Sequence, residues 1–233
     1  MLCLKGGRAL GKWLKWLLVV LSFVCVFMMC VYPFRGFIFG TSAAVVNAKS
    51  NADFGIADFH SSVDKDADGV DDQADVLEGA RAYIATKPVY KSVYYEGGYP
   101  TDEYGVCTDV IAQAMLHAGY DLRALVDADI HARPEAYNMT QPDSNIDFRR
   151  VPNLQVYFAA NAVALTTDLS QIDQWQGGDI VIFTNHIGIV SDVRNRKGVP
   201  YLIHHANPVQ ASYEEDVMAR YEKKIVGHYR LSE

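Results

Sequence analysis

The sequence predicts an α+β domain, with helices packed on an antiparallel sheet, preceded by an N-terminal transmembrane helix. Three observations support this fold class. An apolar run lies near the N-terminus, helical periodicity follows in the first half of the remaining chain, and short β-branched runs separated by turns occupy the last third. With 233 residues, about half of them apolar, the chain is long enough for one domain with its own core plus an extra segment.

The first segment, residues 1–40, has the composition of a membrane anchor or signal segment. Residues 16–32 are apolar except for Ser22, and four cations precede them. A run of about 17 apolar residues is the lower limit for a helix that crosses a bilayer. Because flanking cations stay in the cytoplasm, the domain is expected at the cell membrane, on its extracytoplasmic side. The alternative is a cleaved signal peptide, with a cut before Lys49, which would leave the domain secreted.

Charge is unevenly divided along the chain. The formal net charge is −7, yet residues 1–48 hold five cations and no acids. The remaining chain carries 16 basic against 28 acidic residues and is therefore strongly acidic. Nucleic-acid binding needs a basic surface, so the composition predicts no nucleic-acid partner.

Residues 41–62 are small and polar with weak periodicity, and they are expected to form a linker. The folded domain is therefore predicted over residues 63–233. In its first part, apolar positions at helical spacing predict three helices: residues 76–84, a helix from Cys107 to a stop at Gly119, and residues 154–162.

The last third of the domain is strand-like. Runs rich in Ile, Val and Phe alternate with Gly, Asn and Asp turn residues. The predicted strands are residues 179–183, 186–191, 201–205 and 225–231. Short connections between them favour antiparallel hairpins.

Cys107 is the first candidate for chemistry. Of four cysteines, it alone lies outside the N-terminal segment, so it cannot form a disulfide within the domain. An unpaired thiol is a liability in an oxidising compartment unless it is buried or used. At a helix N-terminus the free N–H groups are expected to lower the thiol pKa, and they can also stabilise an oxyanion.

Histidines complete a possible catalytic group. A cysteine hydrolase needs a thiol, a base beside it and a polar group that orients the base. His186 opens a predicted strand directly after a turn, and His204 and His205 lie on the next strand. Adjacent strands place side chains about 5 Å apart, but successive residues point to opposite faces. Only one of the two later histidines can therefore hold the ring of His186.

Three segments resemble the NlpC-type peptidases of the papain-like superfamily: GVCTDVI at 105–111, WQGGDIVIFTNHIGIVSD at 175–192 and LIHHANP at 202–208. The stretches DGVDDQADVLEGAR, GVCTDV, PDSNIDFRRVPNLQ, HIGIVSD, EED and GHYR carry a closer resemblance, over about residues 64–231, to the bacterial DUF1287 family. It implies a papain-like, NlpC-type fold with Cys107 as nucleophile and His186 as base. The DUF1287 Ile-His pair implies His204 as the third catalytic residue, whereas the His-Ala pair of NlpC enzymes implies His205; we take His204.

The matching motifs contain further polar residues: Asp109, Asp143, Asn145, Asp147, Arg149 and Asp192. Asp109 is expected either to cap the helix that begins at Cys107 or to contact substrate. The stretch that holds residues 143–149 is expected either to line the cleft or to form a hydrogen-bonded loop.

The segment DKDADGVDDQAD at 64–75 predicts a structural calcium site. Calcium loops alternate oxygen ligands and turn sharply at a glycine, which Gly69 supplies at position 6. The predicted ligands stand at positions 1, 3, 5, 7, 9 and 12: Asp64, Asp66, Asp68, Val70, Asp72 and Asp75. Two departures are the short Asp75 in place of Glu and the lack of a preceding helix. The alternative is a solvated acidic loop.

The sequence thus predicts an extracytoplasmic cysteine peptidase or amidase that needs no cofactor for catalysis. Its expected substrate is an amide bond of the cell wall, such as one in a peptidoglycan stem peptide. Acyl transfer by the same Cys-His pair is a close variant. The alternative from another class is a membrane-tethered, calcium-stabilised binding module whose cysteine is inert.

Overall fold

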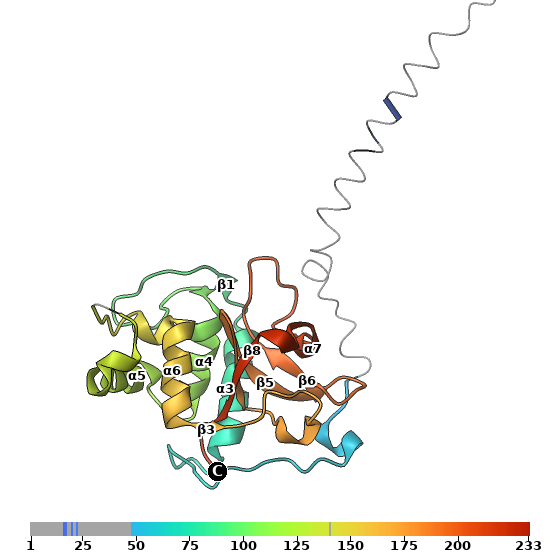
Figure 1. Cartoon of the computed structure of the whole chain (residues 1–233), viewed down its shortest axis with the longest axis horizontal. Helices are drawn as coiled ribbons and strands as arrows, with labels where there is room; N and C mark the ends of the chain where they lie inside the picture. Colours follow the sequence, from blue (N-terminus) through green and yellow to red (C-terminus); the bar gives the residue numbers. More distant parts are fainter. Residues whose placement is uncertain (1–15, 18–19, 21, 23–47, 140) are drawn as a thin grey trace, which may run out of the picture. The chain divides into compact units, whose positions relative to one another are not determined.

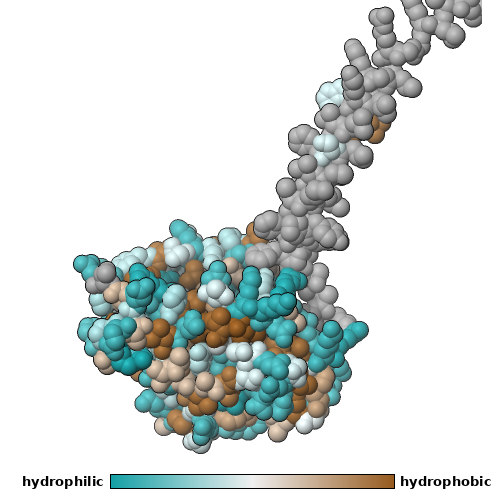
Figure 2. All heavy atoms as spheres, viewed as in Figure 1, coloured by the Kyte–Doolittle hydropathy of each residue, from teal (hydrophilic) through white to brown (hydrophobic). Residues whose placement is uncertain are grey.

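The computed structural model describes residues 16–17, 20, 22, 48–139 and 141–233. The chain divides into two units, Met1–Gly40 and Thr41–Glu233. The second unit contains nearly all the described residues and is treated by itself. In the view of Figure 2, hydrophilic residues cover most of the edge of this unit, and apolar residues gather near the middle.

The predicted fold class is wrong in its transmembrane helix. Among the described residues, no helix is long and apolar enough to cross a membrane. The longest of them, α3 (Asp72–Ala85), has 14 residues, whereas a bilayer span needs about 20 apolar residues. Most of the predicted span, residues 16–32, lies outside the described residues. The described fold is a mixed helix and sheet domain.

Four further α-helices follow α3: α4 (Cys107–His117), α5 (Leu122–Ala132), α6 (Val151–Asn161) and α7 (Met218–Tyr221). Asp71 caps α3, accepting from the N–H groups of Gln73 and Ala74. Gly119 follows α4 with a φ of 77°, which suits glycine at a helix end. The structure thus places α4 and its stop where the sequence predicts them, while α5 occupies a stretch with no helix predicted.

Short 3₁₀ helices complete the helical part: η2 (Asn51–Phe54), η3 (Pro134–Ala136), η4 (Asp147–Arg149), η5 (Ile172–Gln174) and η6 (Glu222–Lys224). The first of them belongs to the segment predicted as a linker. Lys49 pairs with Arg194 through two backbone hydrogen bonds of 2.9 and 2.7 Å. Asn51 is buried and donates to Gln176 at 2.9 Å. From residue 49 onward the predicted linker is therefore part of the folded domain.

The main sheet has six strands in the order β3-β8-β4-β5-β6-β7, and every neighbouring pair is antiparallel. The strands are β3 (Val163–Ala164), β4 (Ile180–Phe183), β5 (His186–Arg194), β6 (Pro200–Ile203), β7 (Glu214–Glu215) and β8 (Ile225–Arg230). The four longer strands match the sequence prediction. A second sheet, β1 (Val89–Tyr90) with β2 (Tyr104–Gly105), is parallel and lies where only loop was expected.

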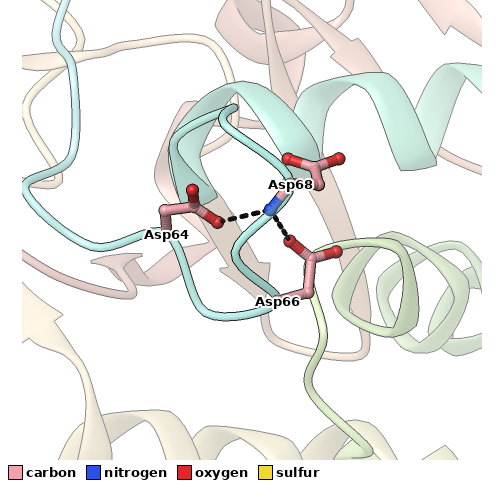
Figure 3. Close-up of side chains that lie close together, drawn as sticks. All are labelled: Asp64, Asp66 and Asp68. Atoms are coloured by element: carbon pink, nitrogen blue, oxygen red, sulfur yellow. Dashed lines mark hydrogen bonds between the residues drawn. The ribbon is translucent and has the colours of Figure 1, made fainter.

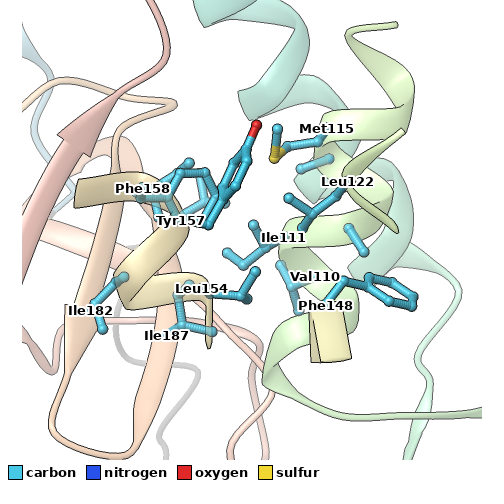
Figure 4. Close-up of a cluster of buried hydrophobic side chains, with 14 of the residues drawn as sticks. Val110, Ile111, Met115, Leu122, Phe148, Leu154, Tyr157, Phe158, Ile182 and Ile187 are labelled. Atoms are coloured by element: carbon cyan, nitrogen blue, oxygen red, sulfur yellow. The ribbon is translucent and has the colours of Figure 1, made fainter. Parts of the chain in front are cut away.

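The main sheet is buried on both faces. Ile182, Ile187 and their neighbours face the cluster formed with α4, α5 and α6 (Figures 1 and 4). The residues that alternate with these along each strand point to the other face of the sheet. They include Val190 and Leu202, which pack in a second cluster with Met218 of α7. This two-sided burial explains why β4 reads as a continuous apolar run instead of an alternating one. In the first cluster, α4 packs against β5.

Candidate active site

Cys107 is the first residue of α4 and is partly exposed. The backbone N–H of Ile187, the residue that follows His186, is near enough to the Cys107 thiol to act on its pKa. Tyr90, on the short parallel sheet, is near enough that burial and the thiol together raise its phenol pKa. The folded chain therefore brings the thiol to the first residues of β5, as the order of the motifs predicts.

His186, His204 and Glu215 form a continuous hydrogen-bonded chain. His186 Nε2 lies 2.8 Å from His204 Nδ1, and His204 Nε2 lies 3.2 Å from a carboxylate oxygen of Glu215. A carboxylate only accepts, so His204 Nε2 donates to it. With both rings neutral, His204 Nδ1 then accepts from His186 Nε2, which leaves the lone pair of His186 on Nδ1. In that tautomer His186 Nδ1 can accept a proton.

Strand register explains why these three side chains meet. Leu202 pairs with Glu215 across β6 and β7, so the Glu215 side chain lies on the sheet face of Leu202 and, two residues on, of His204. Glu214 points to the other face and binds Arg81 at 2.8 Å. No hydrophobic periodicity marked Glu215, because β7 has only two residues. Its position in the EED motif of the resembling family was the available hint.

His205 occupies the opposite face from His204. Its ring makes edge contacts with Tyr90 and Tyr213, each at 5.1 Å between centroids. It is 1% exposed, and its Nδ1 is buried without a hydrogen-bond partner. Of the two neighbours that the sequence left open, the structure places His204 against His186 and His205 among tyrosines.

Burial sets the protonation of the pair. It raises the pKa of the Cys107 thiol to about 11, although the N–H of Ile187 acts in the opposite direction. Burial, then the charges of His204 and His205, lower the pKa of His186 to about 3. The expected low thiol pKa is therefore wrong: desolvation outweighs the helix N-terminus. At neutral pH the resting pair is a thiol and a neutral imidazole.

Asp109 and Arg149 hold the start of α4. Asp109 is fully buried and accepts from the Val106 N–H at 2.8 Å, so it caps the helix. Its carboxylate also takes two bonds from Arg149, at 2.7 and 2.8 Å. Arg149 in turn donates to the Val93 carbonyl at 2.6 Å. Of the two roles predicted for Asp109, the structure shows the capping role, and it adds a buried ion pair.

The other motif residues lie in structural hydrogen bonds. Asp143 accepts from Tyr94 at 3.1 Å and donates its N–H to Asp147 at 2.6 Å. Asn145 binds Arg123 at 2.9 Å. The stretch is thus a hydrogen-bonded loop. Asp192 pairs with Arg81 of α3.

The predicted calcium ligands do not all gather. Asp64, Asp66 and Asp68 each place a carboxylate oxygen within 4.8 Å of the others (Figure 3). Val70 is exposed beside them. Asp72, predicted at position 9, is buried and instead binds the Tyr120 hydroxyl and the N–H of Lys65. The prediction for Asp72 is therefore corrected, because two protein donors already hold its carboxylate.

The free energy of unfolding should fall as the pH is lowered, partly because of His205. Burial, then the charge of His204, lower its pKa to about 4, whereas an unfolded histidine titrates near 6.5. Between these values the unfolded chain binds a proton that the folded chain does not, so this stability is complete above pH 6.5 and is lost as pH falls. At pH 5 the loss is on the order of 2 kcal/mol.

Replacing His205 with phenylalanine keeps the ring contacts and removes this titration. We expect the drop in melting temperature between pH 7 and pH 5 to become smaller in His205→Phe. His131→Gln, at an exposed histidine of α5, serves as the control and should keep the full drop. An unchanged pH dependence in His205→Phe would count against the assignment.

Comparison with known proteins identifies the family. The family model described as domain of unknown function DUF1287 matches residues 77–231. This chain belongs to the DUF1287 family. A family relative in Escherichia coli strain K12, named uncharacterized protein YijF, is 38% identical over 168 residues, covering 66% of this chain and 80% of the relative. No solved structure matches this chain. The match includes Cys107, the three residues of the hydrogen-bonded chain and the Asp109–Arg149 pair.

Proposed function

We propose that this DUF1287 protein is a cysteine hydrolase, a peptidase or amidase, with Cys107 as nucleophile and His186 as base. The observation that carries the proposal is the series of hydrogen bonds from His186 through His204 to Glu215, together with a thiol at a helix N-terminus that senses the backbone of Ile187, the residue after His186. A partly buried series of hydrogen bonds that fixes one imidazole tautomer suits general-base catalysis by that imidazole.

The reaction begins with a neutral pair. His186 Nδ1 takes the thiol proton as Cys107 Sγ attacks the substrate carbonyl, so that no free thiolate needs to form beforehand. Backbone N–H groups in the first turn of α4 stabilise the oxyanion. His186 then gives the proton to the leaving amine, the C–N bond breaks, and a thioester remains on Cys107. Water, deprotonated by His186, attacks the thioester carbonyl, the C–S bond breaks, and His186 returns the proton to Cys107 Sγ as the carboxylic acid product leaves.

The proposed substrate is an amide bond of the cell wall, such as one in a peptidoglycan stem peptide. Its support is the motif resemblance to NlpC-type, papain-like peptidases together with the composition of residues 1–48, which favours export of the domain. Acyl transfer to an amine or alcohol would use the same residues and would differ only in the group that cleaves the thioester.

The test is incubation of the full-length protein with purified peptidoglycan, followed by mass analysis of soluble fragments. We expect fragments with a new amine and a new carboxylate at one amide bond. The Cys107→Ala variant is the control and should release none. Equal release by both proteins, or by neither, would refute the proposal.

One observation favours a second candidate function. The buried thiol has a raised pKa, as expected for a packing cysteine in a binding module. Such a module would bind wall peptide without cleaving it. Sedimentation with intact peptidoglycan, without fragment release, would identify this function.

Glu215 is proposed as a positioning residue that acts through His204. Glu215→Gln should lower kcat about tenfold to a hundredfold and leave KM unchanged, because the amide can donate to His204 Nε2 and favour the wrong tautomer. Glu214→Gln is the matched control: the neighbouring carboxylate faces Arg81 and should leave kcat unchanged. Equal kcat values for both variants would contradict the role of Glu215.

A further inference from the structure

We propose that the loop over residues 64–75 binds one calcium ion through Asp64, Asp66, Asp68 and Asp75, and that the ion fastens this loop to the start of α3. The inference is independent of the proposed catalysis. The proposed ligand set differs from the sequence prediction. Asp72 is left out because protein donors already bind its carboxylate, and Asp75 is kept because one of its oxygens is buried without a partner.

Three exposed carboxylates converge at the turn of the loop. Asp64, Asp66 and Asp68 approach within 4.8 Å of one another, and Figure 3 shows their side chains around the same turn. The N–H of Asp68 donates to both Asp64, at 3.2 Å, and Asp66, at 3.3 Å. Such a cluster alone does not identify a site, since exposed acids gather without an ion.

Asp75 supplies the second observation. It lies in the first turn of α3, is only 2% exposed, and its Oδ2 is buried with no hydrogen-bond partner. A buried carboxylate oxygen without a partner is costly. Asp75 stands at position 12 of the loop whose positions 1, 3 and 5 form the exposed triad, and a cation bound by all four carboxylates would give its orphaned oxygen a partner.

The chemistry of the donors selects the ion. Every proposed ligand atom is a carboxylate oxygen, which suits a hard cation and not zinc or copper. Calcium accepts six to eight oxygens in flexible geometry, whereas magnesium demands a near-ideal octahedron and retains its waters. The loop turns through positive φ at Ala67 and Gly69, and its position-7 carbonyl and water complete the usual calcium shell.

The ion would join two parts of the domain. Gly119, at the end of α4, has a backbone so close to the loop that an added Cβ would lie 3.0 Å from the Cβ of Asp66. The loop thus packs between the N-terminus of α3 and the end of α4, which carries Cys107 at its other end. Calcium is therefore expected to stabilise the folded domain without entering the reaction.

The experiment is thermal unfolding of the full-length protein in chelator, in millimolar calcium and in millimolar magnesium, with calorimetric titration of calcium. At a calcium concentration about 100 times Kd, the melting temperature should rise by about 5 °C or more, with one ion bound. Magnesium should give a much smaller shift.

Two variants make the test specific. Asp75→Asn should abolish the calcium shift, yet in chelator it should melt no lower than the unmodified protein, because a buried unpaired acid is removed. Glu78→Gln removes one charge from an exposed position of the same helix and should keep the full shift. The proposal is overturned by the absence of a calcium shift, by a full shift in Asp75→Asn, or by an equal shift with magnesium.

Discussion

Replacing Cys107 with alanine is expected to lower amide hydrolysis at least about 10⁵-fold, to the rate of the background reaction. The thiol is the only atom group in the proposed mechanism that forms a bond with the acyl carbon, so no neighbour replaces it. The side chain is small and only partly exposed, so alanine should not disturb α4. Initial rates of fragment release measure the effect.

Two further variants help to explain the loss of hydrolysis in Cys107→Ala. Cys107→Ser keeps an oxygen nucleophile in the same place and should also be nearly inactive, because a hydroxyl is far less acidic than a thiol and is a weaker nucleophile toward the carbonyl. His186→Ala should cost about 10²- to 10⁴-fold, the usual range for general acid–base catalysis. Substantial activity in Cys107→Ala, with an unchanged melting temperature, would eliminate Cys107 as the nucleophile.

Replacing Arg149 with methionine is expected to destabilise the domain by about 3–5 kcal/mol, because it leaves the charge of Asp109 buried and unpaired. The side chains of Arg149 and Asp109 are 1% and 0% exposed, so water cannot compensate. The start of α4 depends on the same carboxylate through Val106. Urea unfolding, compared at equal m-value, gives the free-energy change.

The neighbouring arginine provides the control for this prediction. Arg150 is half exposed, with its nitrogen 3.6 Å from Asp147, and Arg150→Met should cost less than about 1 kcal/mol. Adding Asp109→Asn to Arg149→Met should recover part of the loss, since the amide oxygen can still cap Val106 without a buried charge. Equal stabilities for the two arginine variants would show that the ion pair contributes no more than a surface pair.

The candidate catalytic residues could be predicted from the sequence where local patterns are strong. Cys107 begins a helix whose apolar face is periodic, and His186 follows a two-residue turn between two apolar runs; both placements agree with the structure. Residues 122, 126 and 130 of α5 are buried at four-residue intervals, so that helix was detectable, but polar residues around it obscured the pattern. The transmembrane prediction rested on an apolar run of about 17 residues, the lower limit for a span, and on the cations before it.

Other parts depend on contacts between distant residues, which local patterns do not encode. Asn51 joins the domain through Arg194 and Gln176, so a polar segment that looks like a linker is folded. Glu215 reaches His204 through strand register. Asp72 fits the calcium spacing but is held by Tyr120, 48 positions later. The raised thiol pKa is also a tertiary effect, because burial by neighbouring elements outweighs the local helix terminus.

The central claim is that Cys107 forms a thioester with the substrate, and intact-mass spectrometry tests it most directly. Full-length protein and a soluble peptidoglycan peptide are mixed and quenched in acid during turnover. We predict a mass increase equal to the acyl fragment, located on the peptide that contains Cys107 and removed by hydroxylamine. Hydrolysis that proceeds without this adduct, and at the same rate in Cys107→Ala, would contradict the account.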